Sequence, residues 1–284
     1  MPEPITADLS GKTCLVTGAS AGIGKALARQ LARLRARVVL ACRNPDKGEV
    51  VRREIASATG NHDLEVMTVD LSIRGSIDEF TESFAKRHPA LHVLVNNAGV
   101  WLEKRQESAD HIEMTWATNV LGYFRLTDRL LPALRAAPSA RVVNVASQLA
   151  GGLDLSDVEF KRRTYAGRAV YAQSKQANRM FTWALARRLD GTKVTANALH
   201  PGFVSTELFS KAGGVMGVAG WASAKLWARK PDEGADTAAW LAAAPEVEGR
   251  SGLFWIDRQE RRCRFRDEVA EEALWKLCLE MTTA

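Results

Sequence analysis

The segment Thr17-Gly18-Ala19-Ser20-Ala21-Gly22-Ile23-Gly24 decides the fold of this chain. It directly follows a short β-branched apolar run, Thr13–Thr17, and an amphipathic stretch begins within it. Gly18 permits a tight turn, Gly22 lets a pyrophosphate approach the backbone, and Gly24 allows close contact between helix and strand. The free N–H groups at the start of the helix favour a negative charge. A strand, a glycine turn and a helix in this order predict a dinucleotide site, with a purely structural turn as the alternative.

Short apolar runs and amphipathic segments alternate from this turn to the end of the chain. Such alternation is typical of a parallel sheet with helices on both faces. We therefore predict an α/β protein, a single-domain Rossmann fold over residues 1–284 with a doubly wound, seven-stranded parallel sheet. The strands are predicted at Thr13–Thr17, Val38–Cys42, Glu65–Val69, Val93–Asn96, Arg141–Ala146, Val194–Leu199 and Leu253–Ile256. The helices are predicted at Gly22–Leu34, Asp46–Thr59, Ile73–Arg87, Ala109–Ala136, Gly167–Leu189 and Asp232–Ala244.

Two segments depart from this alternation. Residues 203–230 are rich in glycine and small residues and lack strand character. They predict either an apolar lid over a substrate or a loosely packed helical excursion. Residues 257–284 are expected to form a C-terminal helical extension that carries Trp275.

The composition indicates a globular protein, and we expect it in the cytoplasm. Hydrophobic residues make up 46% of the chain and charged residues 25%, which argues against a disordered or fibrous protein. No apolar stretch reaches the roughly 18 residues that a membrane-spanning helix needs, and no secretory signal is visible. Four cysteines without a C-x-x-C spacing fit a reducing compartment. The five histidines lie far apart in the sequence, so we predict no metal site.

The net charge of +6 fits a nucleic acid, an anionic surface or a phosphorylated cofactor as partner. The densest basic cluster, residues 258–266, contains five arginines. Glu260 is interleaved with them, and Phe265 is the only aromatic residue in the cluster. This pattern favours a solvated face over a binding patch, and we predict no nucleic-acid partner.

The end of the second predicted strand indicates which cofactor is bound. A carboxylate at this point, about 20 residues after the glycine turn, would bind the ribose 2′-hydroxyl of NAD. The chain has Cys42 and Arg43 there instead. The permanently charged fork of Arg43 suits a 2′-phosphate and stacking on adenine, so the sequence predicts NADP. Asp70 follows the third strand and is placed to accept from the adenine amino group, with helix capping as its alternative role.

Tyr171 and Lys175 form the candidate catalytic pair. Residues four apart on a helix lie on the same face, one turn apart. The pKa of an isolated tyrosine is about 10, and a nearby cation favours the phenolate, which makes an acid/base catalyst of the phenol. Neither Tyr123 nor Tyr165 has a cation four residues further on. Taken alone, the spacing also fits an ordinary surface helix.

Further motifs accompany this pair: Asn96-Asn97-Ala98-Gly99, Asn119, Ser147, and Pro201-Gly202 with Thr206. With the glycine turn and Asp70, they resemble the short-chain dehydrogenase/reductase family from Leu9 to about Ile256. The resemblance implies a nicotinamide cofactor and a catalytic tetrad of Asn119, Ser147, Tyr171 and Lys175. The cofactor groove expected from the resemblance and from the strand ends consists of Gly18, Ser20, Gly22, Ile23, Gly24, Arg43, Asp70, Leu71, Asn97, Ala98, Gly99, Tyr171, Lys175, Pro201, Gly202, Val204 and Thr206.

The chemistry of hydride transfer agrees with these roles. Reduction of a carbonyl builds alkoxide character on its oxygen, which calls for a proton donor and a second hydrogen bond. Tyr171 would supply the proton and Ser147 the other hydrogen bond. Lys175 would lower the phenol pKa and bind the nicotinamide ribose. The backbone carbonyl of Asn119 would connect Lys175 to solvent through a water.

The spacing of Ser147 and Tyr171, 24 residues, is longer than is usual in the family. This insertion, the Ala41-Cys42-Arg43-Asn44 signature and the helix with Trp275 are similar to the retinol dehydrogenase and WW-domain oxidoreductase branch. That branch implies NADP and a lipophilic alcohol or carbonyl as the substrate. No N-terminal anchor like that of its membrane-bound members is visible.

The leading hypothesis is an NADP(H)-dependent oxidoreductase that interconverts a lipophilic alcohol with its ketone or aldehyde. The alternatives are a carbon–carbon double-bond reductase of the same family and a non-catalytic NADP-binding regulator. Related enzymes often pair through the helices that carry Asn119 and Tyr171, and a homodimer, a homotetramer and a monomer all stay open. The candidate pocket wall, whose members also fit core packing, is Trp101, Gln148, Leu149, Phe209, Met216 and Trp221.

Overall fold

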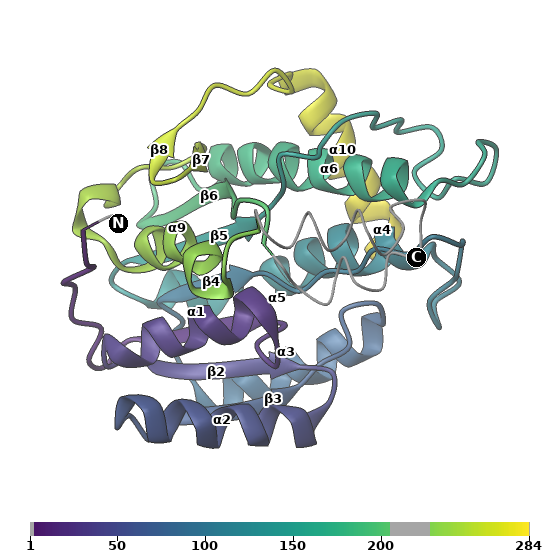
Figure 1. Ribbon diagram of the computed structural model, residues 1–284. Coiled ribbons are helices and arrows are strands. Elements are labelled where there is room, and N and C mark those ends of the chain that lie inside the picture. Colours follow the sequence, from purple (N-terminus) through teal and green to yellow (C-terminus); the bar gives the residue numbers. More distant parts are fainter. Residues whose placement is uncertain (1–2, 205–227, 284) are drawn as a thin grey trace.

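An eight-stranded sheet forms the centre of the protein in the computed structural model, which describes residues 3–204 and 228–283 (Figure 1). The strands lie in the order β3-β2-β1-β4-β5-β6-β7-β8. Strands β1 to β7 are parallel, and β8 pairs antiparallel with β7 at one edge. Their bounds are β1 Thr13–Thr17, β2 Arg37–Cys42, β3 Leu64–Thr68, β4 Val93–Asn96, β5 Ala140–Val145, β6 Val194–His200, β7 Phe254–Ile256 and β8 Gln259–Glu260.

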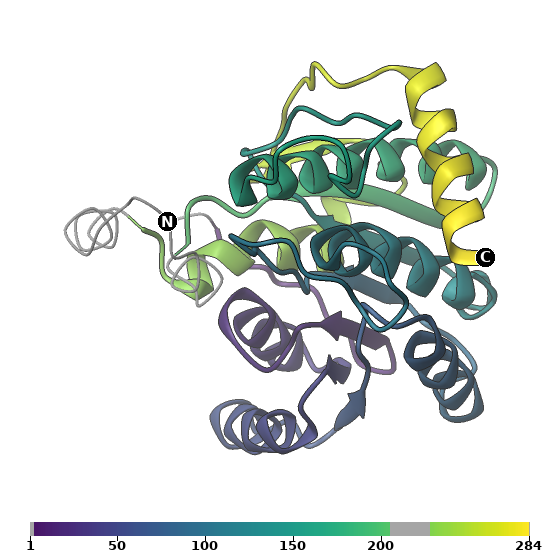
Figure 2. The same ribbon diagram turned by 90° about the vertical axis from the view of Figure 1, so that its right-hand side faces the viewer.

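Helices cover both faces of the sheet (Figure 2). Helices α1, α2 and α9 pack on one face, and α3, α5 and α6 pack on the other, where α10 lies against α6. The bounds of the longer helices are α1 Gly22–Arg33, α2 Pro45–Thr59, α3 Arg74–Arg87, α5 Gly122–Ala136, α6 Gly167–Arg188, α9 Pro231–Ala243 and α10 Glu268–Thr283. The short ones are α4 Met114–Trp116, a π-helical turn η1 Ala117–Leu121 and a 3₁₀ turn η2 Pro245–Val247.

The predicted α/β fold with a doubly wound parallel sheet is confirmed. All seven predicted strands are present, and their ends agree with the prediction within one residue. Strands β1 and β4 are buried along their whole length, which is why continuous apolar runs mark them in the sequence. Strand β8 is the one strand of the described chain that the sequence pattern does not predict, because it consists of two exposed polar residues.

The predicted helix Ala109–Ala136 is wrong in its first part. His111 has a left-handed φ of 60°, so the chain cannot be helical there. Helix α4 begins only after Glu113, whose side chain accepts hydrogen bonds from the backbone N–H groups of Thr115 (2.9 Å) and Trp116 (2.7 Å). The π-helical turn η1 then leads into α5.

The strand order reverses between β1 and β4, because β2 and β3 lie on one side of this point and β5, β6 and β7 on the other. In open α/β sheets, ligands bind beyond the carboxyl ends of the strands at such a reversal. The glycine turn after β1 and the Asn97–Gly99 segment after β4 both lie at this edge. The fold therefore brings the two predicted cofactor segments together.

A row of buried polar side chains ties two helices to the centre of the sheet. Asn96 Nδ2, on β4, donates to Thr127 Oγ1 on α5 (2.9 Å) and to Asn144 Oδ1 on β5 (2.8 Å). Asn144 Nδ2 in turn donates to Thr182 Oγ1 on α6 (2.9 Å). These hydrogen bonds satisfy most polar atoms of the row inside the core and fix α6, the helix of Tyr171 and Lys175, against β5.

Candidate active site

The glycine turn between β1 and α1 is closely packed against the segment after β4. Gly18 has a left-handed φ of 67°, and a Cβ there would lie 2.9 Å from the Cα of Ala98. A Cβ on Gly24 would lie 2.3 Å from the Gly18 carbonyl oxygen and 2.5 Å from Asn97 Nδ2. Ala21, the N-cap of α1, makes no side-chain cap bond, so no capping side chain occupies the first N–H groups of this helix. This geometry suits an anionic group at the start of α1.

Thr17 connects the ends of β1 and β4. Its Oγ1 accepts from the backbone N–H groups of Asn97 (2.9 Å) and Ala98 (3.0 Å), and its carbonyl accepts from Asn97 Nδ2 (2.8 Å). Gly99 follows, and a Cβ there would lie 3.8 Å from Lys175 Nζ. The Asn97–Gly99 segment thus runs from the glycine turn to the candidate catalytic lysine.

The remaining predicted cofactor residues lie around the same edge. Arg43 is exposed just after β2. Asp70 accepts hydrogen bonds from the backbone N–H (2.9 Å) and the hydroxyl (2.6 Å) of Ser72, so one carboxylate oxygen is used in a local turn before α3. Asp70 does not cap this helix, whose N-cap residue is Ile73 and has no side-chain cap bond. The side chain of Leu71 is buried in the core, which leaves only its backbone for a cofactor.

On the other side of the glycine turn, a Cβ on Gly234 of α9 would lie 2.4 Å from a methyl group of the buried Val204 and 3.4 Å from Ile23. Gly202 has a left-handed φ of 83° and lies against the side chain of Arg229. Val204 and Arg229 form an isolated parallel bridge. The half-buried Ser20 and Pro201 lie in the loops after β1 and β6, and Thr206 lies outside the described residues.

The structure brings Ser147, Tyr171 and Lys175 together at the carboxyl end of β5. Ser147 follows this strand, and its hydroxyl lies near enough to the phenol of Tyr171 on α6 to lower the phenol pKa. Lys175 is only 3% exposed, and its Nζ donates to the backbone carbonyl of Val145 (3.0 Å). Nζ lies 5.6 Å from the ring centroid of Tyr171 and 5.4 Å from that of Tyr123.

Burial dominates the titration of this pair. It raises the pKa of Tyr171 to about 12, partly offset by the Ser147 hydroxyl, and it lowers the pKa of Lys175 to about 7. The spacing predicted a lowered phenol pKa, and the direction here is the opposite. The reason is that both groups leave water on folding, which disfavours the phenolate and the ammonium together.

Asn119 lies in the π-helical turn η1 and anchors the chain after β4. Its Oδ1 accepts from the backbone N–H of Val100 (2.8 Å), and its Nδ2 donates to the Val100 carbonyl (3.0 Å) and to Ser174 Oγ (3.1 Å). The sequence predicted a role for the backbone carbonyl of Asn119, whereas these contacts use its side chain. A π-helical turn interrupts the regular helix bonding, which is frequent at functional sites.

Trp101 lies on the candidate catalytic tyrosine. Its ring stacks on that of Tyr171 with centroids 4.7 Å apart and planes 27° apart, and its Nε1 donates to Glu103 (2.9 Å). Gln148 is exposed and Leu149 is half-buried, directly after Ser147. The other predicted wall residues, Phe209, Met216 and Trp221, lie outside the described residues.

Three further side chains at this site are absent from the prediction. Tyr123 donates through its hydroxyl to the carbonyl of Ala98 (2.8 Å), Arg179 donates to the carbonyl of Ser147, and His200 Nδ1 accepts from the backbone N–H of Gln148 (3.0 Å). The spacing of Arg179, four residues after Lys175 on α6, is the one sequence signal that places it on the face of the catalytic pair. Nothing in the sequence pattern marks Tyr123 or His200.

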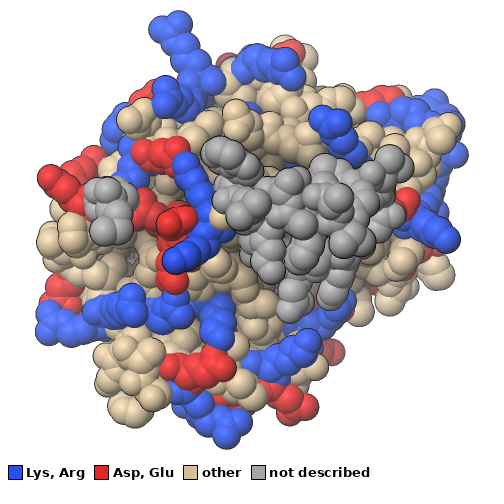
Figure 3. All heavy atoms as spheres, in the orientation of Figure 1, with Lys and Arg blue, Asp and Glu red and all other residues tan. Residues whose placement is uncertain are grey.

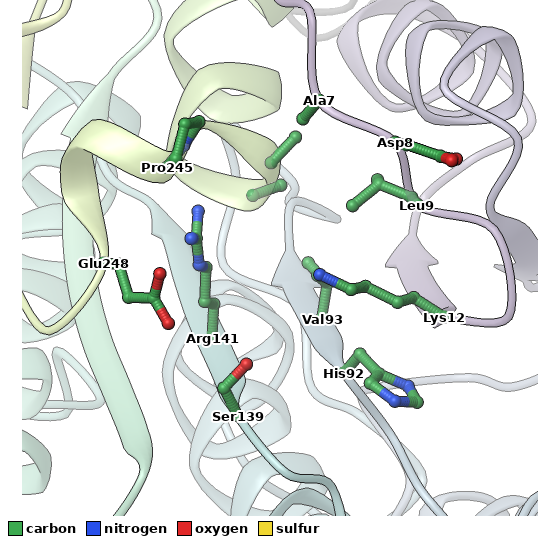
Figure 4. A pocket seen from close by; sticks show the side chains of 12 residues that line it. Ala7, Asp8, Leu9, Lys12, His92, Val93, Ser139, Arg141, Pro245 and Glu248 are labelled. Atoms are coloured by element: carbon green, nitrogen blue, oxygen red, sulfur yellow. The ribbon is translucent and has the colours of Figure 1, made fainter.

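A cavity of about 230 Å³ lies at the opposite end of the sheet. Figure 4 shows the side chains that line it. Lys12, His92 and Ser139, which precede β1, β4 and β5, contribute to its lining. Arg141 lines it as well and donates through Nη1 to the carbonyls of Leu241 (3.2 Å) and Ala244 (2.8 Å), so it satisfies the C-terminal end of α9. This cavity is at the amino ends of the strands and is separate from the candidate active site.

Basic and acidic side chains are mixed over the face in Figure 3. Within the basic cluster of residues 258–266, Arg258 Nε donates to Asp236 (2.8 Å). Glu260 accepts from Arg250 Nη2 (2.6 Å). Among residues 3–204 and 228–283, no group of three or more His, Cys, Asp and Glu side chains is arranged to hold a metal. In the same part of the chain, no helix is long and apolar enough to cross a membrane.

Comparison with known proteins now identifies the family. The model of the family described as short chain dehydrogenase matches residues 12–214. The chain belongs to this family. The short-chain dehydrogenase is 40% identical to polyprenol dehydrogenase of Mus musculus, over 99% of this chain and 87% of the relative. It is 36% identical to retinol dehydrogenase 13 of Homo sapiens, over 96% of this chain and 85% of the relative.

A solved structure of a protein from Mycobacterium paratuberculosis is similar to this short-chain dehydrogenase over its whole length. The TM-score is 0.79 at 30% sequence identity, covering 98% of this chain and 96% of the other. The predicted resemblance to the retinol dehydrogenase branch is confirmed by the named relatives. As a short-chain dehydrogenase, the protein is an oxidoreductase that works with a nicotinamide cofactor.

Proposed function

We propose that this short-chain dehydrogenase interconverts a lipophilic alcohol with its ketone or aldehyde, using NADP(H), with Tyr171 as the general acid and base. One observation carries the proposal. The buried Tyr171 phenol lies beside the Ser147 hydroxyl and one helical turn from the buried Lys175. A proton donor, a second hydrogen-bond donor and the amine of a lysine are therefore present within one site at the carboxyl edge of the sheet.

The residues around this edge fit a dinucleotide. The start of α1 has free N–H groups. Because Gly18 and Gly24 have no Cβ atom, the turn packs directly against Asn97 and Ala98. When bound, the cofactor supplies or accepts a hydride at its nicotinamide ring. Arg43, exposed after β2, would bind the 2′-phosphate of NADP, for which its planar fork is suited.

In the reducing direction, Tyr171 would donate its proton to the carbonyl oxygen of the substrate. Ser147 would donate a hydrogen bond to the same oxygen, where negative charge develops. Lys175 would hold the nicotinamide ribose, near Gly99, in place of its present bond to Val145. The negative charge of a phosphorylated cofactor favours the ammonium form of Lys175. The positive charge of this ammonium in turn favours the phenolate of Tyr171.

An aromatic wall supports an apolar substrate. Trp101 stacks on the ring of Tyr171, so a carbonyl that reaches the phenol would pass along the indole. Leu149, half-buried beside Ser147, would extend this wall. The names of the relatives, polyprenol and retinol dehydrogenases, denote lipophilic alcohols as well.

The test of the activity is NADPH oxidation with a panel of lipophilic ketones and aldehydes. Tyr171→Phe is expected to lower kcat by a factor of about 10² to 10⁴, the usual contribution of general acid catalysis, with NADPH binding retained. Tyr165→Phe is the matched control, because the Tyr165 hydroxyl bonds Glu113 (3.1 Å) away from the phenol of Tyr171. Tight NADPH binding without turnover of any carbonyl would contradict the proposal and support a cofactor-binding regulator.

The test of the cofactor is the ratio of Kd values for NADPH and NADH. Arg43→Ala is expected to weaken NADPH binding by about 1.5–3 kcal/mol, the contribution of a hydrogen bond to a charged group, and to leave NADH binding nearly unchanged. Arg53→Ala, at an exposed position on α2, is the control. Equal weakening of both cofactors would show that Arg43 does not bind the 2′-phosphate.

A further inference from the structure

Arg179 continues the row of Tyr171 and Lys175 along α6. The three residues are spaced by four, so they lie on one face of the helix. Lys175 Nζ donates to the carbonyl of Val145 (3.0 Å), and Arg179 Nη2 donates to the carbonyl of Ser147. Two basic side chains of one helix therefore donate to two carbonyls at the carboxyl end of β5.

The guanidinium of Arg179 is nearly closed off from solvent. The residue is 6% exposed, its Nη1 donates to Cys263 Sγ (3.3 Å), and its Cζ lies 3.8 Å from the ring centroid of Phe254. Burial lowers its pKa, and no carboxylate of the described residues contributes to that shift. A buried cation is costly unless its hydrogen bonds are well oriented, so the Ser147 carbonyl is a partner that Arg179 requires.

The carbonyl that Arg179 binds belongs to the residue whose hydroxyl meets Tyr171. The segment after Ser147 is held at two further points: Gln148 N–H donates to His200 Nδ1 (3.0 Å), and Leu149 N–H donates to Ser147 Oγ (3.1 Å). Neither of these bonds reaches the Ser147 carbonyl. The peptide between Ser147 and Gln148 is therefore held at both of its polar atoms, its N–H by His200 and its carbonyl by Arg179, and Arg179 is the partner of the carbonyl.

We propose that Arg179 is a positioning residue for the reaction, an inference that rests on the proposed function. It fixes the Ser147 peptide so that the hydroxyl reaches the phenol of Tyr171, and through Cys263 it ties this geometry to the segment that leads into α10. Arg179 itself does not touch the reacting atoms. A misplacement of about 1 Å in a catalytic group costs on the order of 10²-fold in rate, so a group that sets the Ser147 peptide affects kcat.

The test is a double-mutant cycle. Arg179→Met keeps the apolar stem and removes the charge, and we expect it to lower kcat roughly 10- to 100-fold without a change in the Kd for NADPH. In a Ser147→Ala background the same substitution should cost nothing further, because the hydroxyl that it positions is gone. Arg179→Lys should recover part of the rate by donating one bond. Arg168→Met, an exposed arginine on α6, is the matched control.

An equal loss of kcat in both backgrounds would assign Arg179 a general structural role and overturn the proposal, as would wild-type kcat in Arg179→Met. Crystal structures of the wild type and of Arg179→Met give an answer that needs no turnover. Ser147 is expected to move by about 1 Å relative to α6 in the variant, and an unmoved Ser147 overturns the proposal. If the wild type turns over no carbonyl, the proposed function fails, while this structural comparison still decides the role of Arg179.

Discussion

Lys175 combines a cationic side chain with a position that water does not reach. It is 3% exposed, and burial lowers its pKa from 10.5 to about 7. Between about pH 7 and 10.5 the unfolded chain therefore holds a proton on this residue that the folded protein has lost. Stability rises with pH wherever the unfolded state binds more protons, so Lys175 makes the protein more stable as the pH rises through this window. Below pH 7 both states are protonated, and folding bears the full cost of burying the ammonium.

Lys175→Met removes the free-energy cost of burying the ammonium. It is therefore expected to raise the Tm at pH 7, measured without added cofactor, by roughly 2–4 °C for each kcal/mol of that cost. The same variant should show a smaller rise of Tm between pH 7 and 9.5 than the wild type. Lys193→Met, at an exposed position before β6, is the control and should leave both quantities unchanged. Thermal unfolding followed by circular dichroism across this pH range measures the effect. A Tm at pH 7 equal to or below that of the wild type would contradict it.

NADPH affinity gives a second measurement on the same variant. If Lys175 holds the nicotinamide ribose, Lys175→Met should raise the Kd for NADPH as well as lower kcat, by an amount typical of a charged hydrogen bond, about 1.5–3 kcal/mol. Fluorescence titration with NADPH checks this result. An unchanged Kd together with a lowered kcat would leave the lysine acting on the phenol pKa alone.

At the scale of residues, the sequence predicts which side chains lie together but not their pKa values. The four-residue spacing places Tyr171 and Lys175 on one helix face, and the structure agrees. The direction of their pKa shifts follows from burial by Trp101, Tyr123 and neighbouring segments, which the local sequence does not reveal. The local sequence does not reveal the surroundings of Arg179 either, because its partner Cys263 lies 84 residues further along the chain.

At the scale of elements, the turn between β1 and α1 depends on glycine at the inner side of the helix. A Cβ on Gly24 would lie 2.3 Å from the Gly18 carbonyl oxygen, closer than real atoms approach. Gly24→Ala is therefore expected to destabilise the protein by about 1–3 kcal/mol, the usual cost of overpacking, and to weaken NADPH binding. Urea unfolding and NADPH titration measure the two effects.

The control for Gly24→Ala is Gly75→Ala, in the first turn of α3. A Cβ there would meet nothing within 4 Å. This substitution is expected to stabilise the protein by about 0.4–1 kcal/mol, because alanine restricts the unfolded chain more than glycine does. A Gly24→Ala variant as stable as Gly75→Ala would show that α1 shifts away from β1 without cost.

The elements that the sequence predicts well are those with a continuous apolar signal. Strands β1 and β4 are examples, because each is buried along its length. The start of α4 was missed because the signal is a single carboxylate, Glu113, that caps the first turn after a left-handed His111. Helical periodicity extends through His111 and Asn119 without a break, so it cannot show where a loop or a π-helical turn interrupts it.

At the scale of the whole molecule, helix α10 closes the face of the sheet that carries α5 and α6. Trp275 lies 4.8 Å from Phe124 and 5.8 Å from Phe181 between ring centroids. Arg187 of α6 pairs with Glu271, a buried carboxylate, and Arg188 pairs with Glu272. The pairs hold α10 against α6, and α6 carries Tyr171, Lys175 and Arg179. The C-terminal extension is therefore expected to share the stability of the site-bearing core.

Two leucines of α10 test whether this extension belongs to one cooperative unit. Leu274 is fully buried in the core on the α5 and α6 face, whereas Leu279 is 45% exposed on the same helix. Leu274→Ala is expected to cost about 2–5 kcal/mol through lost burial and a cavity, and Leu279→Ala should stay within about 0.5 kcal/mol of the wild type. Because the Leu274 side chain contacts the main core, the whole loss should appear in a single unfolding transition, seen alike by far-UV circular dichroism and by tryptophan fluorescence.

NADPH at 100 times its Kd should shift that same transition by about 2.7 kcal/mol, since it binds only the folded state. A separate low-temperature transition in Leu274→Ala, unaffected by NADPH, would instead mean that α10 unfolds independently of the dinucleotide site.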